Sequence, residues 1–147
     1  MTSWPAVWGL SGYSSATGTN QEIDAMEDFG VDNGNKQAGS TLHNWTPGAG
    51  HPGSTAESST IPLSDLADSN SANGVEVAAL VDKQDDTITT YVGGNETAEW
   101  KVAADSPALN TPMNWILGTG NGEDLTVENV QLYTAPGTTV TKSPSAS

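Results

Sequence analysis

The sequence contains no cysteine, which excludes disulfide bonds and thiolate zinc sites. Only four of its 147 residues are lysine or arginine, against 18 aspartates and glutamates, so the formal charge is −14. Such a surface repels a phosphate backbone and an anionic membrane, and we expect no nucleic-acid and no membrane partner. The two histidines are too few for most histidine-rich metal sites.

Long apolar runs are also missing. No stretch has the length and hydrophobicity of a transmembrane helix, and the first five residues lack the basic segment and apolar run of a secretory signal. We therefore expect neither feature in this chain. Neutral, hydroxyl-rich ligands such as glycans remain compatible with the acidic surface, because hydrogen bonds and stacking bind them without cations. Solubility alone explains the charge equally well.

What the sequence does contain is typical of an all-β protein. Sixteen glycines and eight prolines divide it into short runs, and no apolar stripe of helical period appears. Turn signals at residues 83–86 and 93–95 separate β-branched runs. The pattern predicts one domain, residues 1–134, as a sandwich or jelly roll of antiparallel sheets. The predicted strands span residues 4–10, 22–29, 40–45, 75–81, 87–92, 97–102, 113–117 and 125–133.

Two segments differ from this pattern. Residues 47–74 form a long stretch rich in serine, glycine and asparagine, with only Ile61, Leu63 and Leu66 as apolar anchors. We expect a loop there, and loops of that length are usually functional or poorly ordered. Residues 135–147 are rich in serine, threonine and proline, which predicts a linker or a frayed tail.

The most informative segment carries acidic residues at positions 22, 24 and 27. In a regular strand, Glu22 and Asp24 share a face, whereas the odd spacing turns Glu27 to the other face. A β-bulge near Ala25 and Met26 would return Glu27 to the face of the other two. Three carboxylates on one face suit glycoside hydrolysis with retention. The alternative is a solvated acidic strand, which is common in so acidic a protein.

Aromatic residues near this segment support a sugar-binding cleft. Trp4 and Trp8 share a face of the preceding strand, and tryptophan rings are good platforms for the apolar side of a sugar. His43 lies on the following strand, where it would hydrogen-bond a carboxylate or a sugar hydroxyl. Trp45 and Trp115 add to an unusual count of five tryptophans against one phenylalanine. Core packing remains the alternative for each tryptophan, and a structural role for the histidine.

Three segments together resemble glycoside hydrolase family 16, closest to the bacterial laminarinases and other β-1,3(4)-glucanases. They are residues 4–8 (Trp-Pro-Ala-Val-Trp), 22–27 (Glu-Ile-Asp-Ala-Met-Glu) and 41–43 (Thr-Leu-His). The resemblance implies a concanavalin A-like jelly roll of two antiparallel sheets. It implies Glu22 as nucleophile, Asp24 as assisting carboxylate and Glu27 as acid/base. The substrate-binding residues would be Trp4, Trp8, His43, Trp45 and Trp115.

The resemblance also implies a substrate, a setting and an incomplete scaffold. We expect a retaining endo-glycosidase that hydrolyses β-1,3- or mixed-linked β-glucan outside the cell, with no required cofactor. A structural calcium is frequent in the family, but its ligands are not assignable here. Family domains carry further strands before the Trp-Pro-Ala segment, and Gly118 stands where an asparagine is common. The alternatives are therefore a non-catalytic glycan-binding module on the same fold and an inactive partial domain.

Overall fold

The structure is a computed structural model, and it describes residues 4–32, 35–46, 55–62, 74–120, 126–127 and 129–133. Eight strands and one short helix lie within these residues. The strands are β1 (Trp4–Ser11), β2 (Asn20–Asp32), β3 (Asn35–Trp45), β4 (Thr55–Thr60), β5 (Val77–Asp82), β6 (Thr87–Val92), β7 (Asn95–Lys101) and β8 (Met113–Gly120); the helix is α1 (Pro107–Asn110).

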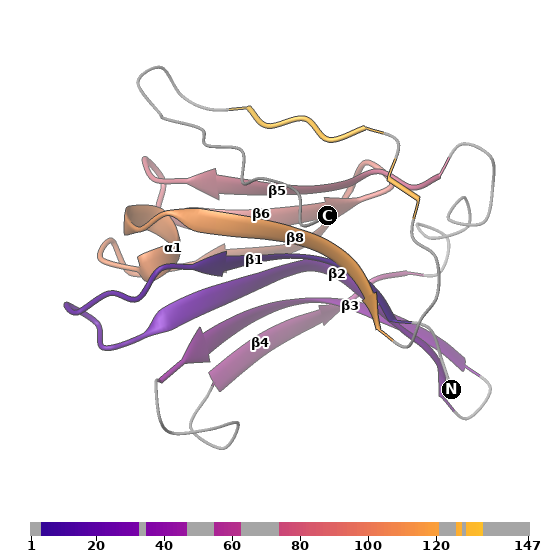
Figure 1. Ribbon diagram of the computed structural model, residues 1–147, viewed down its shortest axis with the longest axis horizontal. Coiled ribbons are helices and arrows are strands. Elements are labelled where there is room, and N and C mark those ends of the chain that lie inside the picture. The colour runs from indigo at the N-terminus through magenta and orange to yellow at the C-terminus, as the bar shows by residue number, and fades with distance from the viewer. Residues whose placement is uncertain are drawn as a thin grey trace, which may run out of the picture.

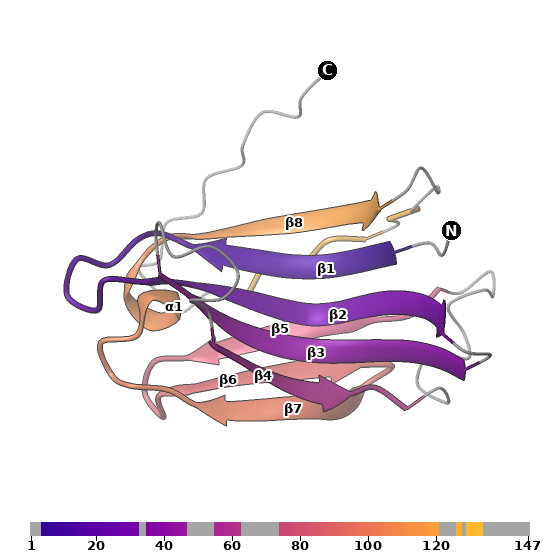
Figure 2. The same cartoon turned by 90° about the horizontal axis from the view of Figure 1, so that it is seen from below.

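The strands form two antiparallel sheets. One has five strands in the order β4-β3-β2-β1-β8, and the other has three in the order β5-β6-β7 (Figures 1 and 2). The smaller sheet packs against β2, β3 and β4 on one face of the larger sheet. This arrangement confirms the predicted all-β sandwich of two antiparallel sheets, as expected of a jelly roll. Among the described residues, the smaller sheet covers one face of the larger sheet.

The smaller sheet follows directly from its turn chemistry. The expected turns join β5 to β6 and β6 to β7. Gly93 and Gly94 both have positive φ, at 60° and 79°. A two-residue hairpin turn with this backbone twist matches the twist of the flanking strands, and glycine adopts it without a steric penalty. The sequence thus predicted this sheet correctly.

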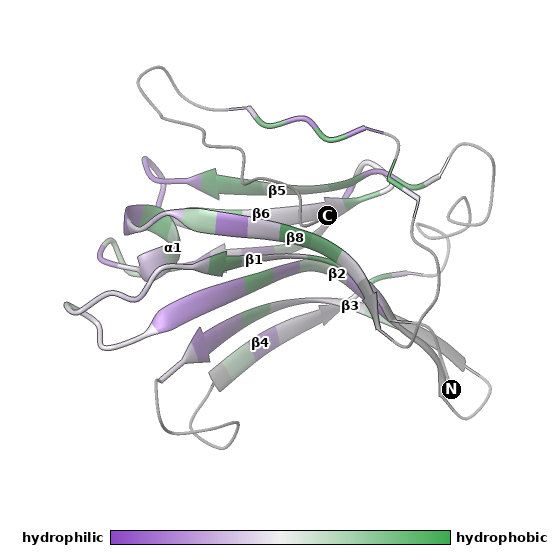
Figure 3. Cartoon of the chain, viewed as in Figure 1, coloured by the Kyte–Doolittle hydropathy of each residue, from purple (hydrophilic) through white to green (hydrophobic). Residues whose placement is uncertain are grey.

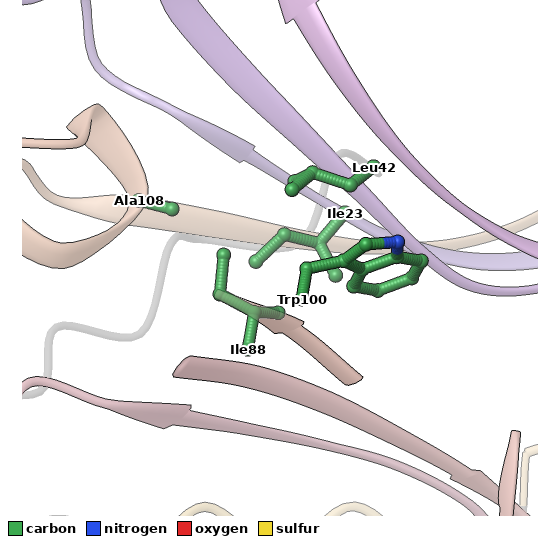
Figure 4. Packing of buried hydrophobic residues seen from close by; sticks show 5 residues of the cluster. All are labelled: Ile23, Leu42, Ile88, Trp100 and Ala108. Atoms are coloured by element: carbon green, nitrogen blue, oxygen red, sulfur yellow. The ribbon is translucent and has the colours of Figure 1, made fainter. Parts of the chain in front are cut away.

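The core lies between the two sheets. Ile23 and Leu42 from the larger sheet meet Ile88 and Trp100 from the smaller one, and Ala108 of α1 closes the cluster at one end (Figure 4). A second cluster joins Met26 and Ala38 to Ile61 and Val92. Coloured by hydropathy, the strands mix apolar and polar residues along their length (Figure 3). This is the expected pattern for strands with one face buried and the other exposed.

Two predictions about the chain were wrong. Residues 126–127 and 129–133 belong to no strand, and Val127, Val130 and Leu132 are 44%, 67% and 57% exposed. Alternating apolar residues form a strand only where a neighbour accepts their backbone hydrogen bonds, and no described strand pairs with this segment. Conversely, β4 lies inside the stretch expected to be a loop, where it pairs with β3 through its backbone.

Ile61, which follows β4, is buried as expected and donates its amide to the carbonyl of Ala38 at 2.9 Å. Leu63 and Leu66 lie outside the described residues, as does the predicted tail, residues 135–147. Among the described residues, no helix has the length and apolar character needed to cross a membrane.

A buried glutamine ties β2 and β3 to the helix. The Gln21 side chain is 5% exposed. Its Nε2 donates to Oδ1 of Asn44 at 2.7 Å, and its Oε1 accepts from the Ala108 amide at 3.0 Å and from the Ser106 hydroxyl. These bonds fix the strand ends next to Glu22 and His43. Gln21 therefore anchors both strands that carry the acidic cluster and its histidine.

Replacing Gln21 by leucine should destabilise the fold. The substitution leaves a buried amide and a buried hydroxyl without their acceptor, at a cost of about 2 kcal/mol in the free energy of unfolding. Denaturant unfolding followed by tryptophan fluorescence would measure the change. Gln84→Leu, in the exposed turn after β5, is the control and should alter stability by less than about 0.5 kcal/mol. Equal stability of the two variants would contradict the anchoring role.

Candidate functional site

The acidic strand contains the bulge that the spacing of its carboxylates required. On β3, Asp24 pairs with Thr41 and Glu27 pairs with Gly39, so three steps on β2 match two steps on β3. Ala25 and Met26 lie in the irregular stretch, and both are buried. The extra residue on β2 brings the Glu27 side chain back to the face of Asp24. Glu22, Asp24 and Glu27 therefore share one face of the sheet, as predicted.

This face is the one turned away from the smaller sheet. Ile23, between Glu22 and Asp24, packs into the core between the sheets, so its two neighbours point the other way. Glu22 and Glu27 are partly exposed, whereas Asp24 is only 2% exposed. The two outer carboxylates are thus accessible to solvent, and the middle one is buried.

Residues directly opposite one another on antiparallel strands share a face. Trp8 of β1 lies opposite Asp24, and His43 of β3 lies opposite Glu22. The structure therefore brings Trp8 and His43 to the two sides of the acidic strand. Trp8, His43 and Trp45 are all partly exposed. That these side chains line a substrate cleft stays a prediction.

His43 is the central contact of the cluster. Its Nε2 lies 2.9 Å from Oδ2 of Asp24 and 3.9 Å from Oε1 of Glu22. Its ring stacks on Trp45, with ring centroids 5.1 Å apart and 22° between the planes. The stack and the short contact to Asp24 together fix the orientation of the imidazole. His43 thus contacts the two carboxylates and the ring of Trp45.

The surrounding carboxylates favour the protonated form of this histidine. The short polar contact with Asp24 is the main cause that raises the pKa of His43 above its ordinary value of 6.5. Burial acts in the opposite direction, and the negative charges of Asp24, Glu22 and Glu27 add to the increase. Protonated His43 therefore stabilises the fold below the unfolded-state pKa. That contribution is lost as the pH rises through the higher folded-state pKa.

Replacing Asp24 by asparagine should lower the pKa of His43 towards its ordinary value, because the change removes the main cause of the increase. Titration of the imidazole signals by NMR measures this directly. His51, the other histidine of the chain, serves as the internal reference and should titrate identically in both proteins. An unchanged pKa of His43 in Asp24→Asn would show that Asp24 is not the source of the increase.

Two of the predicted substrate-binding residues are not placed at this cluster. Trp115 packs against the core between the sheets, because its neighbour Ile116 is the residue opposite Trp8. The prediction that Trp115 lines the cleft is corrected accordingly. Trp4 begins β1, but its side chain lies outside the described residues. Tryptophan count alone could not separate core from cleft.

One polar residue of the cluster's face was missed. Thr41 lies opposite Asp24, and its hydroxyl is 3.2 Å from the Ser58 hydroxyl of β4. The strand parity that places His43 and Trp45 on one face also includes Thr41, so the signal was present in the sequence.

At the other end of the face, a Cβ added to Gly118 would meet no atom within 4 Å. The face is therefore open at Gly118.

Known proteins offer a limited structural similarity to this chain and no sequence match. No protein-family profile matches the sequence, and no curated protein matches it. Among solved structures, the chain is similar to the κ-carrageenase of Zobellia galactanivorans, at 19% identity and a TM-score of 0.42. The match covers 81% of this chain and 46% of that enzyme, so this chain spans less than half of the enzyme's length.

Proposed function

We propose that this chain carries the catalytic carboxylates of a retaining endo-glycosidase of the family 16 type, acting on a β-1,3- or mixed-linked β-glucan. The supporting observation is the bulge in β2, which brings Glu22, Asp24 and Glu27 to one accessible face. A merely solvated acidic strand would need neither the bulge nor the burial of its central carboxylate. The family resemblance of the same residues supplies the substrate class.

In the proposed reaction, the Glu22 carboxylate attacks the anomeric carbon while Glu27 donates its proton to the departing glycosidic oxygen. This gives a covalent glycosyl-enzyme and a free sugar chain. Glu27, now deprotonated, then takes a proton from water, and that water breaks the glycosyl–Glu22 bond. Two inversions at one carbon give net retention. Both carboxyl groups are partly exposed, as these steps require.

Asp24 and His43 would position the nucleophile and set its charge. The buried Asp24 lies between the two catalytic positions in the sequence and contacts His43. The His43 imidazole in turn lies 3.9 Å from Glu22. A positive charge there stabilises the ionised form of Glu22 that must attack. Both residues therefore act through Glu22, as positioning residues.

The sugar chain would lie across the strands, against the partly exposed rings of Trp8 and Trp45. These rings come from β1 and β3, on opposite sides of the acidic strand β2. A sugar ring presents an apolar face that stacks on an indole, and its hydroxyls meet polar groups at the edges. The proposal thus places one sugar-binding wall on either side of the scissile bond.

The test is sugar release from laminarin, lichenan, agarose and κ-carrageenan by the folded chain. We expect reducing ends from one of the two β-glucans, and NMR of the first products should show the β-anomer before mutarotation. Binding without any release would instead favour the glycan-binding module. Neither binding nor release from a chain with a cooperative unfolding transition would refute both functions.

A further inference from the structure

The acidic cluster is also a mixed nitrogen and oxygen donor set. Glu22 and Asp24 each offer a carboxylate oxygen and His43 offers an imidazole nitrogen, and the three atoms lie within 4.8 Å of one another. They come from paired residues of β2 and β3, two strands in the middle of the larger sheet. Such a framework holds the three donors close to one another through the pairing of the two strands.

The separations of the donor atoms bracket those of a zinc site. Zinc binds imidazole nitrogen and carboxylate oxygen at about 2.0–2.2 Å, so two ligand atoms in a tetrahedral site are about 3.3–3.6 Å apart. Nε2 of His43 lies 2.9 Å from Asp24 and 3.9 Å from Glu22, on either side of that value. The Glu22 side chain is 21% exposed, and a zinc ion would draw its carboxylate closer to the other two donors.

The buried carboxylate of Asp24 points into this cluster. Its side chain is 3% exposed, and its Oδ2 receives no aligned hydrogen bond from any residue that the structure describes, although it faces Nε2 of His43. Where His43 is neutral, this buried carboxylate has no positive partner among the described residues, and a bound cation would supply one. The poor alignment of this buried oxygen is an observation separate from the grouping of the three residues.

The donor types favour zinc over calcium. One imidazole and two carboxylates match zinc, whereas calcium prefers six to eight oxygen ligands. We propose that Glu22, Asp24 and His43 bind one Zn²⁺ ion, and that zinc and a glycan substrate exclude each other at this site. The exclusion rests on the proposed function, because a zinc ion on the Glu22 carboxylate would withdraw the negative charge that drives its attack and would occupy the space that the anomeric carbon must enter.

Calorimetric titration of the metal-free chain with ZnCl₂, at about pH 8 and above the ordinary imidazole pKa, tests the binding. We expect one ion per chain, and at least tenfold weaker binding in His43→Gln and in Asp24→Asn. His51→Gln is the matched control and should bind as the native chain does. Circular dichroism confirms that each variant is folded. Equal zinc affinity in His43→Gln and the native chain, or no saturable binding, would overturn the proposal.

The mutual exclusion of zinc and glucan is tested separately, by the inhibition of sugar release. Zinc should inhibit sugar release competitively with the glucan, and a chelator should restore the full rate, whereas CaCl₂ at the same concentration should have little effect. Inhibition that glucan does not relieve would overturn the exclusion. If the chain releases no sugar from any glucan, the proposed function fails, but the calorimetric result on the three variants still decides whether the zinc site exists.

Discussion

Glu22→Gln should abolish sugar release, and Glu27→Gln should slow it about 10²–10⁴-fold, the usual contribution of a general acid. An amide at position 22 cannot attack the anomeric carbon, so no glycosyl-enzyme forms. An amide at position 27 has no acidic proton to give to the leaving oxygen. Both changes preserve size, and both positions are partly exposed, so neither should unfold the protein. Initial rates on the preferred glucan give both values.

The control is a glutamate-to-glutamine substitution elsewhere on the same sheet, at Glu57. Glu57 of β4 lies opposite the core residue Leu42, so it belongs to the other face of the sheet. Glu57→Gln should therefore keep the native rate. Glu22→Ala with added azide adds a sharper check, because azide would attack the anomeric carbon once and give a glycosyl azide of inverted configuration. Sugar release by Glu22→Gln at a rate near the native one would rule out the two-carboxylate mechanism.

Ile88→Ala is expected to lower the free energy of unfolding by about 2–5 kcal/mol, the usual cost of such a truncation in a core. Ile88 is 0% exposed and is the residue of β6 that packs against Ile23 and Leu42 of the other sheet (Figure 4). The alanine leaves a cavity at the contact between the sheets. Denaturant unfolding followed by fluorescence and by circular dichroism measures the loss.

Leu80→Ala provides the comparison for this core. Leu80 lies on β5 in the same sheet but is 50% exposed, so its truncation should cost far less than that of Ile88. A loss equal to that of Ile88→Ala would mean that the two sheets are not held together as described. The activity of Ile88→Ala below its unfolding transition should stay near native, because Ile88 lies on the core side of the sheets.

The spacing of residues 22, 24 and 27 determined much of the candidate site from the sequence alone. Side chains of a strand alternate, so only a bulge places all three carboxylates on one face, and the register of β2 with β3 contains it. The two hairpins of the smaller sheet were equally predictable, because paired glycines and short polar turns between β-branched runs have few other solutions. These features depend on residues close together in the chain.

Other features were decided only by contacts between distant segments. The polar strand β4 exists because β3 offers it backbone hydrogen bonds, whereas the more apolar residues 129–133 pair with no described strand. Trp115 faces the core because the register of β8 with β1 sets Ile116, not Trp115, opposite Trp8. The burial of Asp24 beside His43 likewise required two strands in register. Local sequence sets alternation within a strand, but which face is buried depends on the strand that pairs with it and the sheet that covers it.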